Sequence, residues 1–238
     1  MGSQIICNLM KILILTMCHQ TNDENFDVFK KIWLDKIEIL KNKNYSIDVK
    51  FLYCSEFDET TQNYIVNVDN LLSNCSEDYW TSLLKKVMNG FEYFINTDYD
   101  LVFKTNLSTI INFDLFYELC QKIFSEESYI YEGIIGEYEN YSFCSGAGML
   151  LNRKSVELIL KNKNQIDDKW TDDIFIGFIL NLNGVRPTNN FLNRFDILKS
   201  STNVNESEIK KYSHIRIKIR QGLIDSEMSK KVFNFLYV

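Results

Sequence analysis

A long apolar run near the N-terminus constrains the fold more than any other feature of the sequence. Residues 11–18 (KILILTMC) are almost continuously apolar, with no alternation of polar and apolar side chains. Such a run is typical of a parallel strand that is covered on both faces. Apolar residues at helical spacing follow over 26–40, and a second strand-like segment follows over 47–53. This order predicts a β-α-β unit, and therefore an α/β fold with a parallel sheet.

The rest of the chain continues to alternate between helical and strand-like patterns. Helical patterns cover 77–94, 113–124, 154–160, 172–182 and 226–236, and strand-like patterns cover 101–103, 129–135, 142–151, 191–198 and 214–219. Residues 56–70 are polar and give no clear pattern. The chain has one proline and no low-complexity linker or internal repeat. We therefore expect one domain over residues 1–238, with a nucleotide-binding half over about 10–108 and a catalytic and acceptor half over about 109–238.

Charge and cysteine content exclude several classes of protein. The net charge of -6 argues against a nucleic-acid partner, because phosphate backbones select basic surfaces. No apolar stretch has the length of a membrane span, and we interpret residues 5–18 as a buried strand instead of a signal peptide. The six cysteines form no metal-binding spacing, so we expect mostly buried thiols in a reducing compartment and a cytoplasmic protein.

The segment 99–108 (YDLVFKTNLS) is the centre of the functional interpretation. It predicts a short buried strand over 101–103 that ends in the polar tip 104–108. Ligands of α/β proteins bind at the carboxyl ends of the strands, so the tip is where chemistry is expected. Asp98 and Asp100 have the D-x-D spacing of a metal site, but they precede the strand and lie about 15–20 Å from its tip. We therefore expect them to have no metal-binding role.

Two adjacent carboxylates open the helix predicted over 172–182. Asp172 and Asp173 are helix-capping residues in one interpretation and a general base with an auxiliary acid in the other. Trp170 stacks on a sugar ring or packs against the protein. The residues alone leave both pairs of alternatives open.

Two further segments carry candidate ligand-binding residues. Residues 145–148 (SGAG) permit a tight turn and close approach of the backbone to a ligand. Residues 214–220 (HIRIKIR) place His214 and three cations on one face of a strand and three isoleucines on the other. This pattern fits a half-buried edge strand. It fits equally well a basic surface that faces a diphosphate.

Taken together, these segments resemble the β-1,3-galactosyltransferase and Fringe-type glycosyltransferases. Residues 99–106 (YDLVFKTN) are similar to the strand of that family that ends in K-T-D-x-D, and 143–153 (FCSGAGMLLNR) to its S-G-A-G-y-x-L-S-R segment. Residues 172–177 (DDIFIG) resemble its E-D-V-x-x-G helix start, and His214 lies near its late metal-binding histidine. The Asn106 variant with a basic late strand also resembles compact, unanchored homologues of giant viruses and some bacteria.

The resemblance implies an α/β fold with a single GT-A (Rossmann-like) domain, whose mixed, mostly parallel central sheet is flanked by helices. It implies that Asp173 is the catalytic base, with Asp172 beside it, and that Trp170 is on the acceptor side. The donor-binding residues that it implies are Thr16, Lys85, Asn106, Ser108, Ser145, Gly146 and Gly148, and the basic residues Lys104, Arg216, Lys218 and Arg220 would face the pyrophosphate.

A metal ion is the part of the family pattern from which the sequence departs. Asn106 and Ser108 stand where the family has metal-binding aspartates, which leaves His214 as a further candidate ligand for Mn²⁺ or Mg²⁺. Hard divalent cations prefer carboxylate oxygens, so we expect either weak metal binding or none.

The function implied is inverting transfer of a sugar from a nucleotide-sugar, usually a UDP-sugar, to a hydroxyl of a glycan or glycoprotein. The alternative is a catalytically inactive GT-A-like protein that binds a glycan or a nucleotide. An intact Asp173 and S-G-A-G turn favour the enzyme, and the degenerate D-x-D favours the binding protein.

Overall fold

The computed structural model describes residues 10–19, 24–43, 45–57, 63–77, 81–124, 128–165, 170–199, 203–220 and 222–238. Its larger sheet contains β1 (Ile12–Met17), β2 (Ile47–Ser55), β3 (Tyr64–Val66), β4 (Asn70–Asn74), β5 (Leu101–Asn106), β7 (Tyr131–Tyr138) and β8 (Tyr141–Asn152). The smaller sheet contains β6 (Thr109–Ile111), β9 (Arg194–Leu198) and β10 (His214–Lys218). The helices are α1 (Glu24–Asn42), α2 (Thr81–Ile95), α3 (Phe113–Phe124), α4 (Arg153–Lys161), α5 (Asp172–Leu182), α6 (Glu206–Ile209) and α7 (Gly222–Tyr237), with a 3₁₀ turn, η1, over Lys163–Gln165.

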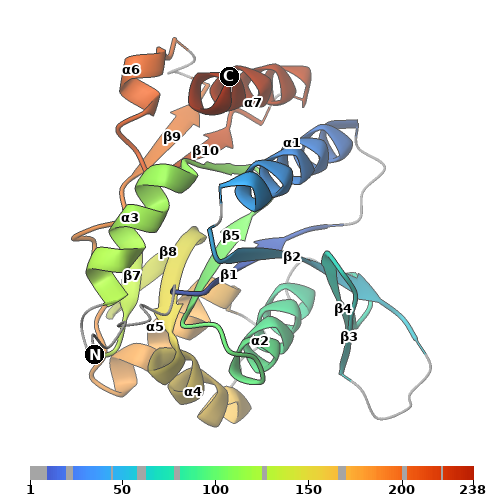
Figure 1. The fold of residues 1–238 in the computed structure, drawn as a ribbon. Coiled ribbons are helices and arrows are strands. Elements are labelled where there is room, and N and C mark those ends of the chain that lie inside the picture. Colours follow the sequence, from blue (N-terminus) through green and yellow to red (C-terminus); the bar gives the residue numbers. More distant parts are fainter. Residues whose placement is uncertain are drawn as a thin grey trace, which may run out of the picture.

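The larger sheet has the order β3-β4-β2-β1-β5-β8-β7 (Figure 1). The neighbours β4, β2, β1 and β5 are parallel, and β8 is antiparallel to both β5 and β7. The predicted β-α-β unit is confirmed, since β1 and β2 pair in parallel from Ile12 opposite Ile47. The fold is therefore α/β with a mixed, mostly parallel sheet between helices.

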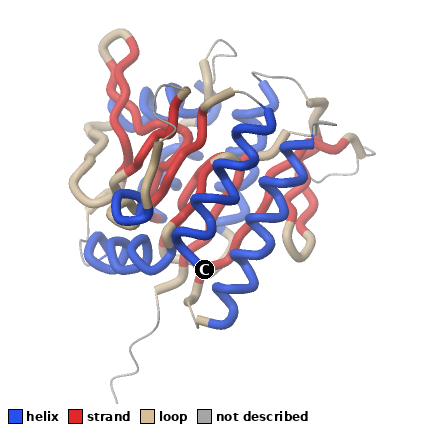
Figure 2. Tube along the Cα trace, turned by 90° about the horizontal axis from the view of Figure 1, so that it is seen from above, coloured by secondary structure: helices blue, strands red, loops and turns tan. Residues whose placement is uncertain are grey.

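Helices cover both faces of this sheet, and the core is divided accordingly (Figures 1 and 2). One cluster of buried residues packs α1 and α3 against one face, with Trp33, Phe103 and Phe116 among its members. A second cluster packs α2, α4 and α5 against the other face. A third cluster lies between the smaller sheet and α7. None of the described helices combines the length and the apolar character that a membrane span requires.

The order of the smaller sheet is β6-β10-β9, which corrects one interpretation of the basic strand. β10 is the central strand, antiparallel to β6 and parallel to β9, and is not an edge strand. Its isoleucines Ile215 and Ile217 are buried in the third cluster, as the alternation predicts. The packing of these isoleucines against the third cluster therefore fixes the position of the polar face of β10.

The central strand β5 is longer than the sequence predicted. Lys104 and Thr105, expected in the polar tip, continue the strand and are 2% and 0% exposed. The tip begins after Asn106, where the indole nitrogen of Trp33 donates a hydrogen bond of 2.9 Å to the carbonyl oxygen of Leu107. This buried bond from α1 anchors the turn between β5 and β6.

A buried lysine on α1 produces the first testable prediction. Lys36 is 0% exposed, its Nζ lies 4.5 Å from the centre of the Trp33 ring, and it has no hydrogen-bond partner among the described residues. Burial lowers the pKa of Lys36 well below its ordinary value. The unfolded chain then binds more protons than the folded chain until the pH reaches the ordinary lysine pKa of about 10.4, so stability rises with pH.

We predict that Lys36→Met raises the free energy of unfolding at pH 7 by about 1–3 kcal/mol, because it removes an unpaired polar group from the core. This gain in stability should shrink as the pH approaches about 10.4, because the amine of Lys36 is then neutral in the unfolded chain as well as in the folded chain. Urea unfolding over a pH series measures both effects. Lys31→Met, at an exposed position of the same helix, is the control and should change neither. A loss of stability in Lys36→Met would contradict the prediction.

Candidate active site

A cleft of about 420 Å³ opens at the carboxyl ends of β1 and β5, where Met17 pairs with Asn106. It is the position at which α/β sheets bind ligands, outside the carboxyl ends of the strands. One wall is formed by the start of α5 and the middle of β8. The opposite wall is formed by the polar face of β10, and the end of β1 closes the third side.

A buried ion pair joins the sheet to the first of these walls. Lys104 Nζ of β5 lies 2.5 Å from Asp172 Oδ2 of α5, and it also donates a hydrogen bond of 2.8 Å to the carbonyl oxygen of Gly146. The two side chains are 3% and 7% exposed. Lys104 and Asp172 therefore neutralise each other at the base of the cleft, where the sequence suggested a pyrophosphate ligand and an auxiliary acid.

The carboxylate of Asp173 lines the cleft and is held by three donors. Its Oδ1 accepts hydrogen bonds from the Thr171 hydroxyl at 2.6 Å and from the backbone N–H of Ile174 at 3.0 Å. Its Oδ2 accepts one from the backbone N–H of Gly146 at 3.0 Å. An ionised carboxylate has about four lone-pair sites, so one site remains for a ligand hydroxyl. The position at the second residue of α5 also favours a negative charge through the helix dipole.

The glycines of the S-G-A-G segment allow β8 to approach its neighbours closely. A Cβ atom on Gly146 would lie 2.7 Å from Lys104 Nζ and 3.3 Å from Asp173 Oδ2. A Cβ atom on Gly148 would overlap the imidazole of His214. Ser145, Gly146 and Ala147 line the cleft, whereas Gly148 is not among its lining residues. The segment is part of a continuous strand and not a turn.

His214 lies behind β8 and does not line the cleft. It is 0% exposed, its ring packs edge-on to Phe103, and its Nδ1 shares a hydrogen bond of 2.9 Å with the Ser213 hydroxyl. Burial, followed by the charge of Arg194, lowers the pKa of His214 to about 3. The ring is therefore neutral at physiological pH.

The wall formed by β10 carries cations. Arg216 and Lys218 line the cleft, whereas Arg220 follows the strand at a positive φ of 60° and is exposed. Burial, and then the charge of Arg194, lowers the pKa of Arg216. The charge of Arg216, and then burial, lowers the pKa of Lys218. The two cations on this wall thus repel each other.

The third side of the cleft begins at Met17, one residue beyond the predicted site. Thr16 is 0% exposed inside β1, and Met17, Cys18 and His19 line the cleft instead. Burial raises the pKa of the Cys18 thiol to about 12, which keeps it protonated. Lys85 points to solvent from α2.

Next to Lys85 in the chain, Lys86 is fully buried and reaches the cleft side of α2. It donates a hydrogen bond of 2.8 Å to the carbonyl oxygen of Cys18 and forms an ion pair with Glu77. Glu77 also contacts the ring nitrogen Nδ1 of His19 at 2.8 Å. Lys86, not Lys85, therefore supports the end of β1.

The remaining predicted residues occupy separate places. Asn106 lines the cleft, whereas the Ser108 carbonyl accepts a hydrogen bond of 3.1 Å from the backbone of Ile217 in β10. Trp170 packs edge-on to Phe178 of α5, with ring centres 4.5 Å apart, next to the cleft residue Thr171. Asp98 is exposed and pairs with Lys11 at the opposite end of β5. The cleft thus brings together Lys104, Asn106, Ser145, Gly146, Asp172, Asp173, Arg216 and Lys218 of the predicted residues.

The donor set of the cleft does not fit a divalent metal ion. Asp172 is paired with Lys104, three donors hold Asp173, and His214 lies behind β8. Asn106 offers one neutral oxygen, whereas hard divalent cations take six or more oxygens that usually include carboxylates. No group of three or more His, Cys, Asp or Glu side chains among the described residues is placed to hold a metal.

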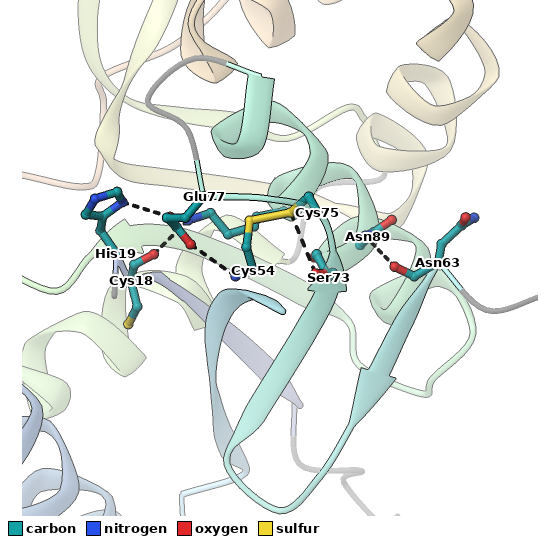
Figure 3. The surroundings of a disulfide bond; sticks show 9 residues. Cys18, His19, Cys54, Asn63, Ser73, Cys75, Glu77 and Asn89 are labelled. Carbon is teal, nitrogen blue, oxygen red and sulfur yellow. Dashed lines mark hydrogen bonds and ion pairs between the residues drawn. A yellow bond between two sulfur atoms is a disulfide. The ribbon is translucent and has the colours of Figure 1, made fainter. Parts of the chain in front are cut away.

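One disulfide bond beside the cleft is an exception to the expectation that most cysteines are buried thiols. Cys54 at the end of β2 is bonded to Cys75 just after β4, with Cα atoms 5.2 Å apart, whereas Cys18, Cys120 and Cys144 are buried and free. Cys7 lies outside the described residues. Figure 3 shows Glu77 between His19 and the backbone of Cys54, whose N–H donates a hydrogen bond of 3.3 Å to Glu77 Oε2. The disulfide therefore fixes the segment that carries Glu77.

Sequence reasoning missed several residues that shape the site. Arg194 and Asp196 of β9 form an ion pair, and Arg194 also donates a hydrogen bond of 2.8 Å to the Ser145 hydroxyl. Their spacing of two residues, which places both on one face of a strand, was the available signal. Lys86 follows Leu83 by three residues and therefore lies on the apolar face of α2, where a lysine is unusual.

The fold of the chain resembles that of a solved glycosyltransferase structure. A crystal structure of a glycosyltransferase involved in the glycosylation of the major capsid of PBCV-1 aligns with a TM-score of 0.53, over 93% of this chain and 99% of that chain, at 10% sequence identity. The fold is that of a glycosyltransferase. In sequence, the chain matches no protein-family model and none of the curated proteins.

Two further solved structures align with lower TM-scores. The catalytic domain of Drosophila β-1,4-galactosyltransferase 7, in complex with xylobiose, aligns with a TM-score of 0.44 at 13% identity, over 76% of this chain. The chain spans 65% of the length of that Drosophila chain. A mutant of the same enzyme, in complex with manganese, UDP-Gal and xylobiose, aligns with a TM-score of 0.43.

We predict that replacing Cys54 and Cys75 by serine lowers the free energy of unfolding by about 3 kcal/mol, because the unfolded chain regains the freedom of the 21-residue loop. Urea unfolding measures this loss, and a reducing agent should produce the same loss in the unmodified chain. The double variant is the matched control, since the reducing agent should leave its unfolding midpoint unchanged. An unmodified chain whose midpoint does not respond to the reducing agent would show that the bond does not stabilise the fold.

Proposed function

We propose that the chain is an inverting glycosyltransferase that moves a sugar from a nucleotide-sugar to a hydroxyl group of a glycan or glycoprotein. The expected donor is a UDP-sugar. The shared glycosyltransferase fold supports the reaction class. The position of the cleft at the ends of β1 and β5 supports binding of a nucleotide there, as in other open α/β sheets.

The carboxylate of Asp173 is the observation that carries this proposal. It lies in the cleft, its orientation is fixed by Thr171, Gly146 and its own helix, and one lone-pair site remains available. A base that is already held in place loses little freedom when the substrates bind, which is a main source of catalytic rate. Asp172 acts through position, because its ion pair with Lys104 fixes the start of α5.

The reaction then follows from the two walls of the cleft. Asp173 takes the proton of the acceptor hydroxyl, and the acceptor oxygen forms a bond to the anomeric carbon of the donor sugar. The bond between that carbon and the β-phosphate oxygen breaks on the opposite side, and the nucleoside diphosphate leaves with the electron pair. Arg216 and Lys218 line the same cleft. In this proposal they stabilise the developing negative charge, because preorganised charges contribute strongly to catalysis.

An aromatic surface next to Asp173 supports an acceptor site. Trp170, Phe178 and Tyr141 are half-buried and form a row, with ring centres 4.5 Å and 5.0 Å apart. The row leads to Thr171, whose hydroxyl holds the proposed base. Half-exposed aromatic rings of this kind present apolar surface on which a sugar ring can stack, so we propose Trp170 as the first acceptor-binding residue.

We predict that Asp173→Asn lowers the rate of sugar transfer by a factor of at least about 100, the usual contribution of a general base. Release of UDP from a panel of UDP-sugars, with and without glycan acceptors, measures the rate. Asp98→Asn is the matched control, because Asp98 is an exposed aspartate at the other end of β5. Unfolding midpoints of both variants establish that they fold. Transfer by Asp173→Asn at the rate of the unmodified chain would remove Asp173 as the base.

A glycan-binding or nucleotide-binding protein without catalysis is the second candidate. The neutral side chains of Asn106 and Ser108, at positions where related enzymes carry metal-binding aspartates, favour it. The same assay separates the two candidates. Binding of a UDP-sugar without any release of UDP, in the presence or absence of acceptors, would favour the binding protein.

A further inference from the structure

The two walls of the cleft differ in how completely their charges are compensated. On the α5 wall, Lys104 and Asp172 neutralise each other at 2.5 Å, which leaves the single negative charge of Asp173. Next to the β10 wall, β9 carries Asp196, and Arg194 occupies both of its oxygens, with Nε 2.6 Å from Oδ1 and Nη2 3.0 Å from Oδ2. The charges of Arg216 and Lys218 therefore have no carboxylate committed to them among the described residues.

The guanidinium of Arg216 includes a buried nitrogen atom that the described residues leave unpaired. Its Nε is buried and has no hydrogen-bond partner among the described residues. The strand around it is fixed, because Ile215 and Ile217 are buried beneath β10 and the backbone pairs with β6 and β9 on both sides. A buried donor without a partner costs free energy, and a bound anion would supply the missing acceptor.

The arrangement around Arg216 suits a diphosphate. A guanidinium can form two parallel hydrogen bonds to phosphate oxygens, and an ammonium such as that of Lys218 adds a point charge. The mutual repulsion that lowers the pKa of Lys218 would be relieved by an anion between the two cations. Arg194 already bonds to the Ser145 hydroxyl, so it holds β8 against this wall instead of facing the ligand.

We propose that Arg216 and Lys218 neutralise the diphosphate of the donor directly, so that the nucleotide binds without a divalent cation. This inference rests on the proposed function, because it assigns the part of the same cleft that holds the donor. The cleft offers too few free oxygens to hold a metal ion. The two fixed cations therefore compensate the negative charge of the diphosphate in place of the metal.

The experiment measures the affinity for UDP by calorimetry in EDTA and in Mn²⁺. We expect the two dissociation constants of the unmodified chain to agree within about twofold. Arg216→Met and Lys218→Met should each weaken binding in EDTA by about tenfold to a hundredfold, the range for loss of hydrogen bonds to a charged group. Lys210→Met with Lys211→Met is the control that removes two exposed positive charges of the α6 segment, and it should leave the affinity unchanged.

Three other outcomes would contradict the inference, the assignment of the two residues or the proposed function. Binding in Mn²⁺ but not in EDTA would overturn the inference and leave the proposed function standing. Binding in EDTA that neither Arg216→Met nor Lys218→Met weakens would remove these two residues as the diphosphate site. Absence of UDP binding in both conditions would count against the proposed function itself. Unfolding midpoints without ligand verify that each variant folds. If Arg216→Met does not fold, Lys218→Met provides the test, because Lys218 is at the more exposed position.

Discussion

The buried ion pair between Lys104 and Asp172 is the interaction on which the candidate site depends. It connects the middle of the sheet to the first residue of α5, and Lys104 extends the connection to Gly146 of β8. Gly146 in turn donates to Asp173. Removing one partner of such a pair leaves a buried charge uncompensated, at a cost of about 3–5 kcal/mol. The position of the proposed base is therefore determined by a contact that does not include the base.

Much of the fold could be predicted because its elements are encoded locally. The apolar run of β1, the amphipathic pattern of α1 and the strand β2 define the β-α-β unit, and α3 and α5 begin and end at the predicted residues. The acidic pair at the start of α5 is likewise a local signal. The meeting of α5 with the ends of β1 and β5 followed from general rules for α/β sheets and from the family resemblance.

The features that could not be predicted depend on contacts between distant segments. Cys54 and Cys75 meet because β4 pairs with β2, and β4 carries too short a pattern to be recognised. β10 is central because β6 and β9 lie on its two sides. Lys85 and Lys86 differ by one position, which turns a side chain by about 100° around a helix. Lys85 therefore points to solvent, whereas Lys86 is buried. Lys104 is buried because Asp172, far along the chain, compensates its charge.

The division of the core into clusters has a consequence for how the cleft varies among related chains. Asp173 stands on α5, whose apolar face belongs to the second cluster, whereas Arg216 and Lys218 stand on β10, which rests on the third cluster under α7. Val232 of α7 and Ile179 of α5 are thus structural determinants of opposite walls, although neither lines the cleft. The distance between Asp173 and the two cations can therefore change when either cluster is repacked, without the substitution of any residue that lines the cleft.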